Sequence, residues 1–173
     1  MTRFIFTIFL LLGMGLLISD ASAQKVAVVD INEVLSSMED YQAAQTELDR
    51  VAAEWRQQIA QEFDKIKSMY NKFQAEQVLL SPEDKAKKED EIIKKETEVR
   101  EMQKAKFGPE GALFKKRQEM VAPIQDKVFA AIEAYASEKG IDIIFDKGGA
   151  TGLLFTNAEY DKTSDLKKRL NIK

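Results

Sequence analysis

The sequence predicts a mostly helical α+β protein, in which a long antiparallel helical hairpin projects from a small β body. Two observations lead to this fold class. Between Tyr41 and Phe107 the chain has no glycine and a single proline, Pro82, near the middle of the stretch. On both sides of this stretch lie short runs of β-branched and apolar residues, which are typical of buried strands. We therefore expect a hairpin arm that is held at its base by strands.

The division of the chain follows from the same pattern. Residues 24–40 and 108–173 are expected to form the β-rich body with flanking helices. Residues 41–107 are expected to form the arm, with its turn at residues 80–82. The 150 residues that this leaves after residue 23 are a length typical of one domain.

Residues 1–23 have the pattern of a cleaved secretion signal. Arg3 provides a positive charge, residues 4–18 form an apolar run, and Ala21-Ser22-Ala23 fits the small-x-small pattern that a signal peptidase reads. The apolar run is shorter than the roughly 20 residues of a membrane-spanning helix. We therefore predict cleavage after Ala23 and export of the mature chain.

The first half of the arm carries one apolar stripe. Its members follow one another in steps of three or four residues, the period of one helix face, and are Tyr41, Ala44, Leu48, Ala52, Trp55, Ile59, Phe63, Ile66, Tyr70 and Phe73. The recurring 3-4-4 steps indicate a nearly straight helix pair. A helix over residues 41–80 would be about 60 Å long, against a radius of gyration of roughly 15 Å for a compact domain of this size. The arm must therefore project.

The second half of the arm begins at a helix-start pattern. Ser81 can cap the helix, Pro82 suits its first position, and two acids follow. Acid–base pairs at a spacing of four residues come next: Glu83/Lys87, Asp84/Lys88, Asp90/Lys94, Glu91/Lys95 and Glu96/Arg100. Each such pair contributes about 0.2–0.5 kcal/mol to an exposed helix. Local charge pairs are therefore expected to replace part of the burial near the turn.

Beyond the arm, Gly108-Pro109-Glu110-Gly111 interrupts the returning helix, and an apolar stripe then resumes from Val121 to Tyr135. Pro123 lies within this stripe and predicts a kink, because proline removes a backbone donor. Gly140 follows Lys139 and predicts the end of the helix.

Three apolar segments predict short strands, at residues 25–31, 141–145 and 152–155. The glycine-rich residues 147–151 are expected to form a hairpin turn between the last two strands. Thr163 is expected to cap a short final helix that runs to Leu170.

The composition removes most classes of enzyme. The chain contains no cysteine and no histidine, so disulfides, thiolate metal sites, the commonest general base and the commonest metal ligand are all missing. We predict a protein that is not an enzyme and needs no cofactor and no metal; an enzyme acting through paired carboxylates is the alternative. The net charge of −3 gives no broad attraction to nucleic acid or to an anionic membrane.

The two ends of the mature chain match a known family. The matching segments are KVAVVDINEVL at residues 25–35, EKGIDIIFDK at residues 138–147 and YDKTSDLKKRL at residues 160–170. Together with the signal and the charged hairpin, they make the chain resemble the Skp/OmpH family of periplasmic chaperones. The resemblance implies a homotrimer with a central β-barrel between subunits and three hairpin arms around a cavity. It also implies ATP-independent holding of unfolded outer-membrane β-barrel proteins, here called clients.

This resemblance assigns candidate residues. The intersubunit barrel would use apolar strand positions: Val26, Val28, Ile141, Ile143, Phe145, Leu153 and Phe155. Clients would contact apolar residues of the distal arm: Met69, Tyr70, Phe73, Val78, Leu79, Leu80, Ile92 and Met102. Attraction to acidic client segments would come from Lys65, Lys72, Lys87, Lys94 and Arg100. For some of these the hairpin core (Tyr70, Phe73) or the turn itself (Leu79, Leu80) is the alternative role.

Two features depart from the family pattern. Family members are often strongly basic, whereas this chain is mildly acidic, so a peripheral contact with the membrane or with lipopolysaccharide is left open. The break at residues 108–111 has no clear counterpart and suggests an extra hinge. A structural coiled-coil spacer or adaptor of the cell envelope is the rival function, because a long hairpin fits it equally well.

Overall fold

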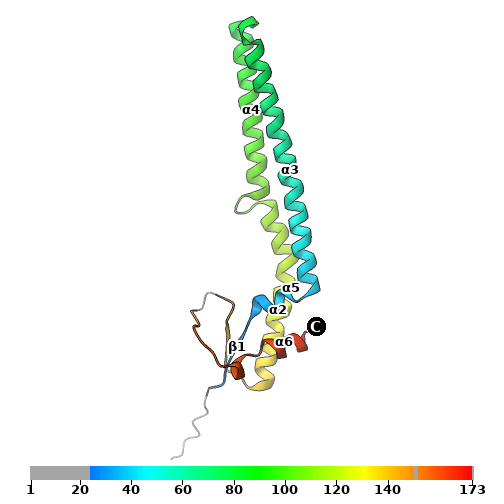
Figure 1. The fold of residues 1–173 in the computed structure, drawn as a ribbon, viewed down its shortest axis with the longest axis vertical. Coiled ribbons are helices and arrows are strands. Elements are labelled where there is room, and N and C mark those ends of the chain that lie inside the picture. The colour runs from blue at the N-terminus through cyan, green and yellow to red at the C-terminus, as the bar shows by residue number, and fades with distance from the viewer. Residues whose placement is uncertain (1–23, 150–151, 173) are drawn as a thin grey trace, which may run out of the picture.

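The computed structural model describes residues 24–149 and 152–172. The predicted secretion signal and two residues of the predicted hairpin turn lie outside these ranges. The described chain forms a long helical arm that rises from a small body at its base (Figure 1). The predicted fold class is confirmed: long helices dominate, and the sheet is small.

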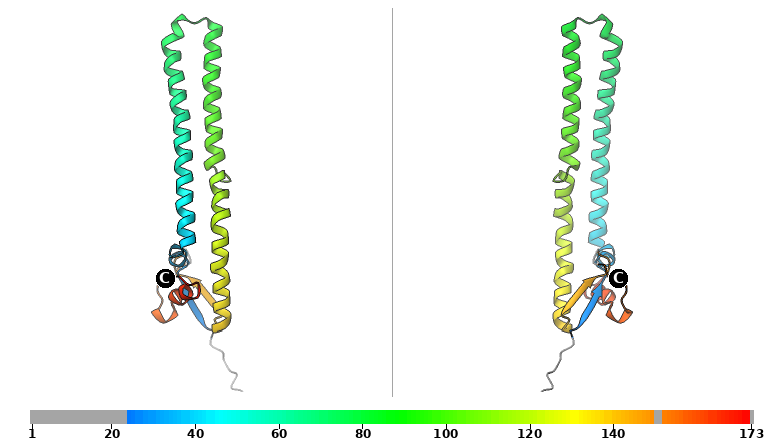
Figure 2. Two further views of the ribbon diagram at one scale, coloured as in Figure 1. Left: turned by 90° about the vertical axis from the view of Figure 1, so that its right-hand side faces the viewer. Right: turned by 90° about the vertical axis from the view of Figure 1, so that its left-hand side faces the viewer.

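The arm consists of three α-helices. Helix α3 (Glu39–Glu76) ascends, a short 3₁₀ turn η2 (Gln77–Leu79) reverses the chain, and α4 (Pro82–Phe107) descends. Helix α5 (Ala112–Lys139) continues the descent into the body, so that α3 lies beside α4 and then beside α5 (Figure 2). The arm is therefore longer than the predicted residues 41–107, because its base includes the first part of α5.

One buried seam holds the upper arm together. Ile59, Ile66 and Phe73 of α3 meet Ile92 and Val99 of α4. The α3 members are seven residues apart, so the interior here follows a seven-residue repeat. The predicted 3-4-4 stripe is wrong in this half: Phe63 and Tyr70 are 45% and 48% exposed. Met69 packs beside the seam, one residue before the position that the stripe assigned to Tyr70.

The helix start at Ser81 and Pro82 forms as predicted, but most of the predicted charge pairs on α4 do not. The Ser81 hydroxyl accepts a hydrogen bond from the backbone N–H of Asp84 at 3.2 Å, and Pro82 is the first residue of α4. Of the pairs expected on α4, Glu96–Arg100 forms, at 2.8 Å. Lys95 instead pairs with Glu98, and Lys88 reaches across the hairpin to Glu76. Three-residue and cross-helix partners therefore compete with the four-residue spacing.

The Gly108–Gly111 break, here called the elbow, is a tight loop between α4 and α5. The N–H of Gly111 donates to the carbonyl of Gly108 at 2.9 Å. A Cβ atom at Gly108 would lie 2.5 Å from the carbonyl oxygen of Lys104, so the loop requires glycine there. Helix α5 then continues through exposed Pro123 and ends at Gly140, which has a φ of 60°. The predicted end at Gly140 is confirmed.

The body contains a two-stranded parallel sheet. Strand β1 (Val26–Val29) pairs with β2 (Ile143–Asp146), with Val26 opposite Ile143. The predicted strand at residues 152–155 and its hairpin are wrong: the described residues of this segment are irregular and do not pair with β2. Residues 161–163 occupy the other edge of β1 instead, because Val28 bridges to Asp161 and the N–H of Lys162 donates to the Val28 carbonyl.

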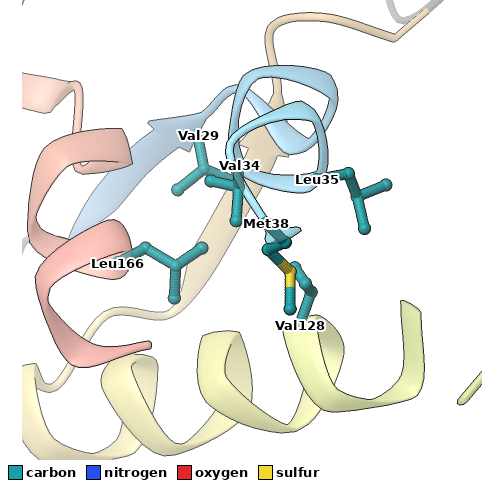
Figure 3. Close-up of a cluster of buried hydrophobic side chains, with 6 residues drawn as sticks. All are labelled: Val29, Val34, Leu35, Met38, Val128 and Leu166. Atoms are coloured by element: carbon teal, nitrogen blue, oxygen red, sulfur yellow. The ribbon is translucent and has the colours of Figure 1, made fainter. Parts of the chain in front are cut away.

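Three short helices complete the body: α2 (Ile31–Ser36), the 3₁₀ turn η3 (Ala158–Tyr160) and α6 (Thr163–Arg169). The body core lies between β1, α2, α5 and α6 (Figure 3). Its buried members are Val29, Val34, Leu35, Met38, Val128 and Leu166.

The predicted cap at Thr163 is wrong. Thr163 is the first helical residue of α6, whose N-cap position is Lys162. Its hydroxyl oxygen accepts a hydrogen bond from the N–H of Asp30, at 2.9 Å, and the hydroxyl donates to Asp161 at 2.6 Å. Thr163 therefore ties the C-terminal segment to the end of β1 instead of capping its own helix.

Candidate interaction surfaces

The two strands present an apolar face that points away from the body core. Because side chains alternate along a strand and Val28 lies opposite Phe145, the side chains of Val26, Val28, Ile143 and Phe145 share this sheet face. Ala27 and Val29 point the other way and are buried. Ile143 and Phe145 remain 40% and 41% exposed. Four of the seven residues predicted for the intersubunit barrel therefore lie on one face of the sheet.

The irregular segment after the second strand extends this apolar face. Leu153 and Phe155 line a groove of roughly 410 Å³ with Val26, Val28 and Phe145. Leu154, which the prediction left out, is 98% exposed, and Phe155 is 79% exposed. Ile141, the remaining predicted barrel residue, borders a neighbouring groove beside Tyr135. Neighbouring exposed apolar side chains of this kind indicate an interaction surface.

An ion pair fixes the segment that borders this face. The Nζ of Lys147 lies 2.6 Å from Asp161 Oδ2, and the hydroxyl and N–H of Thr163 donate to Asp161 Oδ1. Desolvation alone would raise the pKa of Asp161, but the hydrogen bonds from Lys147 and Thr163 outweigh it and hold the pKa at about 2. Asp161 therefore stays charged and anchors both neighbours.

The predicted client residues of the arm fall into three groups. Phe73 and Ile92 are buried in the seam and present no surface to a client. Met69, Leu80 and Met102 are partly buried against the same seam. Tyr70, Val78 and Leu79 are exposed by 48%, 82% and 86%. The sequence prediction missed Ile93, which is 59% exposed beside buried Ile92.

The predicted basic residues fall into two groups, those that form an ion pair on the arm and those that do not. Lys65 pairs with Glu62 at 2.6 Å, and Arg100 pairs with Glu96. Lys72, Lys87 and Lys94 are exposed and form no ion pair with any described side chain.

A family comparison identifies the chain. The sequence model of the family described as outer membrane protein (OmpH-like) matches residues 25–170, which includes the sheet face, the arm and the YDKT segment. The chain belongs to the OmpH-like family. No curated protein sequence matches it significantly.

A solved structure shares the OmpH-like fold. It is an OmpH-like protein from Caulobacter crescentus that is named as a candidate outer membrane chaperone. It superposes with a TM-score of 0.69 at 9% sequence identity and covers 87% of this chain and 85% of its own. At this identity the match establishes the fold alone and does not assign a role to any residue of the OmpH-like chain.

Two further findings describe the OmpH-like chain. Within residues 24–149 and 152–172, none of the helices combines the length and the apolar character that a membrane crossing requires. The same ranges contain no group of three or more acidic side chains placed to hold a metal ion.

Sequence reasoning also missed an aromatic cluster at the elbow of this OmpH-like arm. Trp55 of α3 and Phe107, the last residue of α4, meet edge to face with their ring centroids 6.2 Å apart. The Nζ of Lys106 lies 4.2 Å from the centroid of the Trp55 ring, and the guanidinium of Arg56 lies 5.7 Å from that of Phe107. Trp55 was placed on the apolar stripe, but the interruption at residues 108–111 gave no sign that Phe107 would meet it.

Proposed function

We propose that this protein is an ATP-independent holdase of the periplasm, which binds unfolded outer-membrane β-barrel proteins and prevents their aggregation. The observation that carries the proposal is the exposure of large apolar side chains on a projecting arm, foremost Val78 and Leu79 at its tip. An unfolded barrel protein exposes alternating apolar residues that pair with other chains. A surface that binds such segments lowers the concentration of free unfolded chain by mass action.

Membership of the OmpH-like family supports this role, as does the likeness to a structure named as a candidate outer membrane chaperone. Export by the predicted signal would bring the protein to its clients in the periplasm. We include no lipid or lipopolysaccharide partner, because a net charge of −3 provides no general attraction to anionic surfaces.

The active species of the proposal is a homotrimer. A two-stranded sheet is marginal by itself, and the sheet face leaves Ile143, Phe145, Leu154 and Phe155 largely exposed. Joining three copies through this face would bury these side chains and set three arms around a shared cavity.

The rival function is a structural spacer of the envelope. A spacer requires a stiff rod, and it gives no reason for the exposed side chains at positions 70, 78 and 79. It also predicts no affinity for an unfolded client.

The test is size exclusion with light scattering of the mature protein, residues 24–173, after dilution of a urea-unfolded outer-membrane β-barrel protein into an excess of it without nucleotide. A soluble species with the mass of three subunits plus client supports the proposal. If the client precipitates while the protein elutes unchanged, the holdase function is wrong and the spacer is the better account.

A triple variant then tests the arm surface. We expect Tyr70→Ser/Val78→Ser/Leu79→Ser to remain trimeric but to suppress aggregation less well. Phe129→Ser provides a control, because Phe129 is 48% exposed, as Tyr70 is, but lies on α5 near the body. If the triple variant and the control suppress client aggregation equally well, the side chains at positions 70, 78 and 79 do not contribute to client binding.

A further inference from the structure

A groove crosses the arm beside the elbow. It has a volume of roughly 380 Å³ and lies between α3 and α4. The residues that line this elbow groove are Arg56, Ile59, Ala60, Phe63, Gln103 and Phe107. Its lining is mainly apolar, and the Phe63 ring stays 45% exposed at its side. The groove thus offers an open apolar surface of a size that suits one large side chain.

One cation, Arg56, is part of the lining of this groove. Arg50 pairs with Glu47 and Glu54, Lys65 with Glu62, and Arg100 with Glu96. Arg56 and Lys106 instead lie against the rings of Phe107 and Trp55, and neither forms an ion pair with a described side chain. Arg56 therefore brings to the groove one positive charge that no described acidic side chain pairs with.

The elbow places these groups together. Helix α4 ends at Phe107 because the chain turns at Gly108, and the loop leaves no room for side chains at Gly108 or Gly111. Interrupting an otherwise continuous helix costs backbone hydrogen bonds and requires two glycines. A break of this kind, which works against local helix stability, is expected where a site depends on it.

We propose that the elbow groove binds an extended segment of an unfolded client in which an aromatic side chain lies next to an acidic one. The inference rests on the proposed holdase function and names the chemistry of one of its contacts. The aromatic side chain enters the groove against Ile59, Phe63 and Phe107. The neighbouring carboxylate pairs with Arg56, which forms no ion pair with a described side chain. The occupant is defined by this charge complementarity together with the apolar lining.

The chain contains one tryptophan, and it is part of this cluster. The Trp55 ring contacts Phe107, which lines the groove, so the Trp55 emission reports on the groove without any label. The experiment titrates the mature protein with a tryptophan-free decapeptide in which phenylalanine alternates with aspartate, and follows the Trp55 emission. We expect a saturable change in emission. A matched peptide with lysine in place of aspartate should bind about tenfold more weakly or worse, and one with serine in place of phenylalanine should give no change.

Two variants localise the effect. Phe63→Ser removes an exposed ring that lies outside the buried seam, and Arg56→Gln removes the positive charge of the groove while it keeps the apolar lining. We expect each to weaken the binding of the acidic peptide about tenfold, and the charge variant also to abolish the preference over the lysine peptide. Phe129→Ser is the matched control, since its ring is equally exposed but distant in sequence. Far-UV circular dichroism verifies that all three variants keep their helices.

The outcomes separate this inference from the proposed function. If the wild type holds the unfolded barrel protein but both groove variants bind the peptide with wild-type affinity, the elbow groove is not the site and the holdase function stands. If the wild type binds the peptide but lets the barrel protein precipitate, the holdase function fails, and the groove then has no role in holding clients. Weakened peptide binding in both groove variants, with holding by the wild type, supports the inference.

Discussion

The arm and the body are stabilised in opposite ways. In the arm, the seam joins two helices across one turn, and the ion pairs of Arg50, Lys65, Lys95 and Arg100 span three or four residues. In the body, Lys25 N–H donates to Asp142, 117 residues away, and Asp30 N–H donates to Thr163, 133 residues away. Contacts across a single turn therefore hold the upper arm, whereas the body closes only when both ends of the chain meet.

The topology explains this difference. Parallel strands require a crossover connection, and here the crossover between β1 and β2 is the whole arm. Non-local contacts form late and at a high cost in chain entropy, whereas helical contacts form early. A helical arm can therefore change or fray locally, while damage to the body affects the base from which the arm projects.

The largest expected difference between body and arm is in the free energy of unfolding that is lost when one buried side chain of each core is truncated to alanine. Leu166 is 1% exposed at the junction of α6 with the body core. Leu166→Ala should lower the free energy of unfolding by about 3 kcal/mol. Ile66→Ala in the arm seam should cost less, about 2 kcal/mol, because a two-helix layer can close over the lost volume.

Urea unfolding at fixed protein concentration measures both changes, and amide hydrogen exchange locates them. We expect Leu166→Ala to increase exchange throughout the body and Ile66→Ala to increase it in the upper arm alone. Exchange that rises over the whole molecule in the Ile66→Ala protein would contradict the idea that the arm responds locally.

The next largest expected effect is on the stability of the body, and it depends on pH. Asp161 ties Lys147 and Thr163 together, and its pKa of about 2 lies below the ordinary value of 3.8. A lowered folded-state pKa stabilises the protein above the unfolded-state pKa, and this contribution is lost as pH falls toward the folded-state value. Asp161→Asn should therefore cost about 2 kcal/mol at neutral pH, and the gap from the wild type should close between about pH 4 and pH 2.

Thermal unfolding of both proteins across this pH range measures the gap. Glu138, whose pKa is also held at about 2 by Arg169 and Lys139, titrates in both proteins and cancels in the difference. A gap that stays constant down to pH 2 would show that Asp161 stabilises the body by packing and not by its charge.

The sequence predicted the arm well because its signals are local. Ser81, Pro82 and Gly140 mark helix ends through their own backbone and side-chain chemistry, and the structure confirms each of them. The stripe was wrong at Phe63 and Tyr70 because a step of three or four residues fits either of two adjacent positions. The choice between them depends on where α4 lies, which one helix does not reveal.

The body was predicted less well because its signals are distant in the chain. Residues 152–155 are apolar enough for a strand, but they do not pair with β2, and the second neighbour of β1 comes from residues 161–163 instead. Thr163 has the chemistry of a helix cap, yet Asp30 is the group that it reaches. Of the seven residues predicted for an intersubunit barrel, Val26, Val28, Ile143 and Phe145 share one sheet face, because period-two alternation is a local signal, whereas Ile141, Leu153 and Phe155 lie outside the strands.

The smallest expected effect tests the local character of the arm at its far end. Ser81→Ala removes the hydroxyl that accepts from the N–H of Asp84, which should weaken α4 by about 1 kcal/mol. Because the tip is exposed and far from the body, the loss should appear as faster hydrogen exchange at the start of α4, with the body unchanged. Ser81→Asp is the matched control, since aspartate also caps helices and should keep exchange slow. If Ser81→Ala instead lowers the unfolding midpoint of the whole protein, the tip and the body are one cooperative unit, and the contrast between arm and body does not extend to the end of the hairpin.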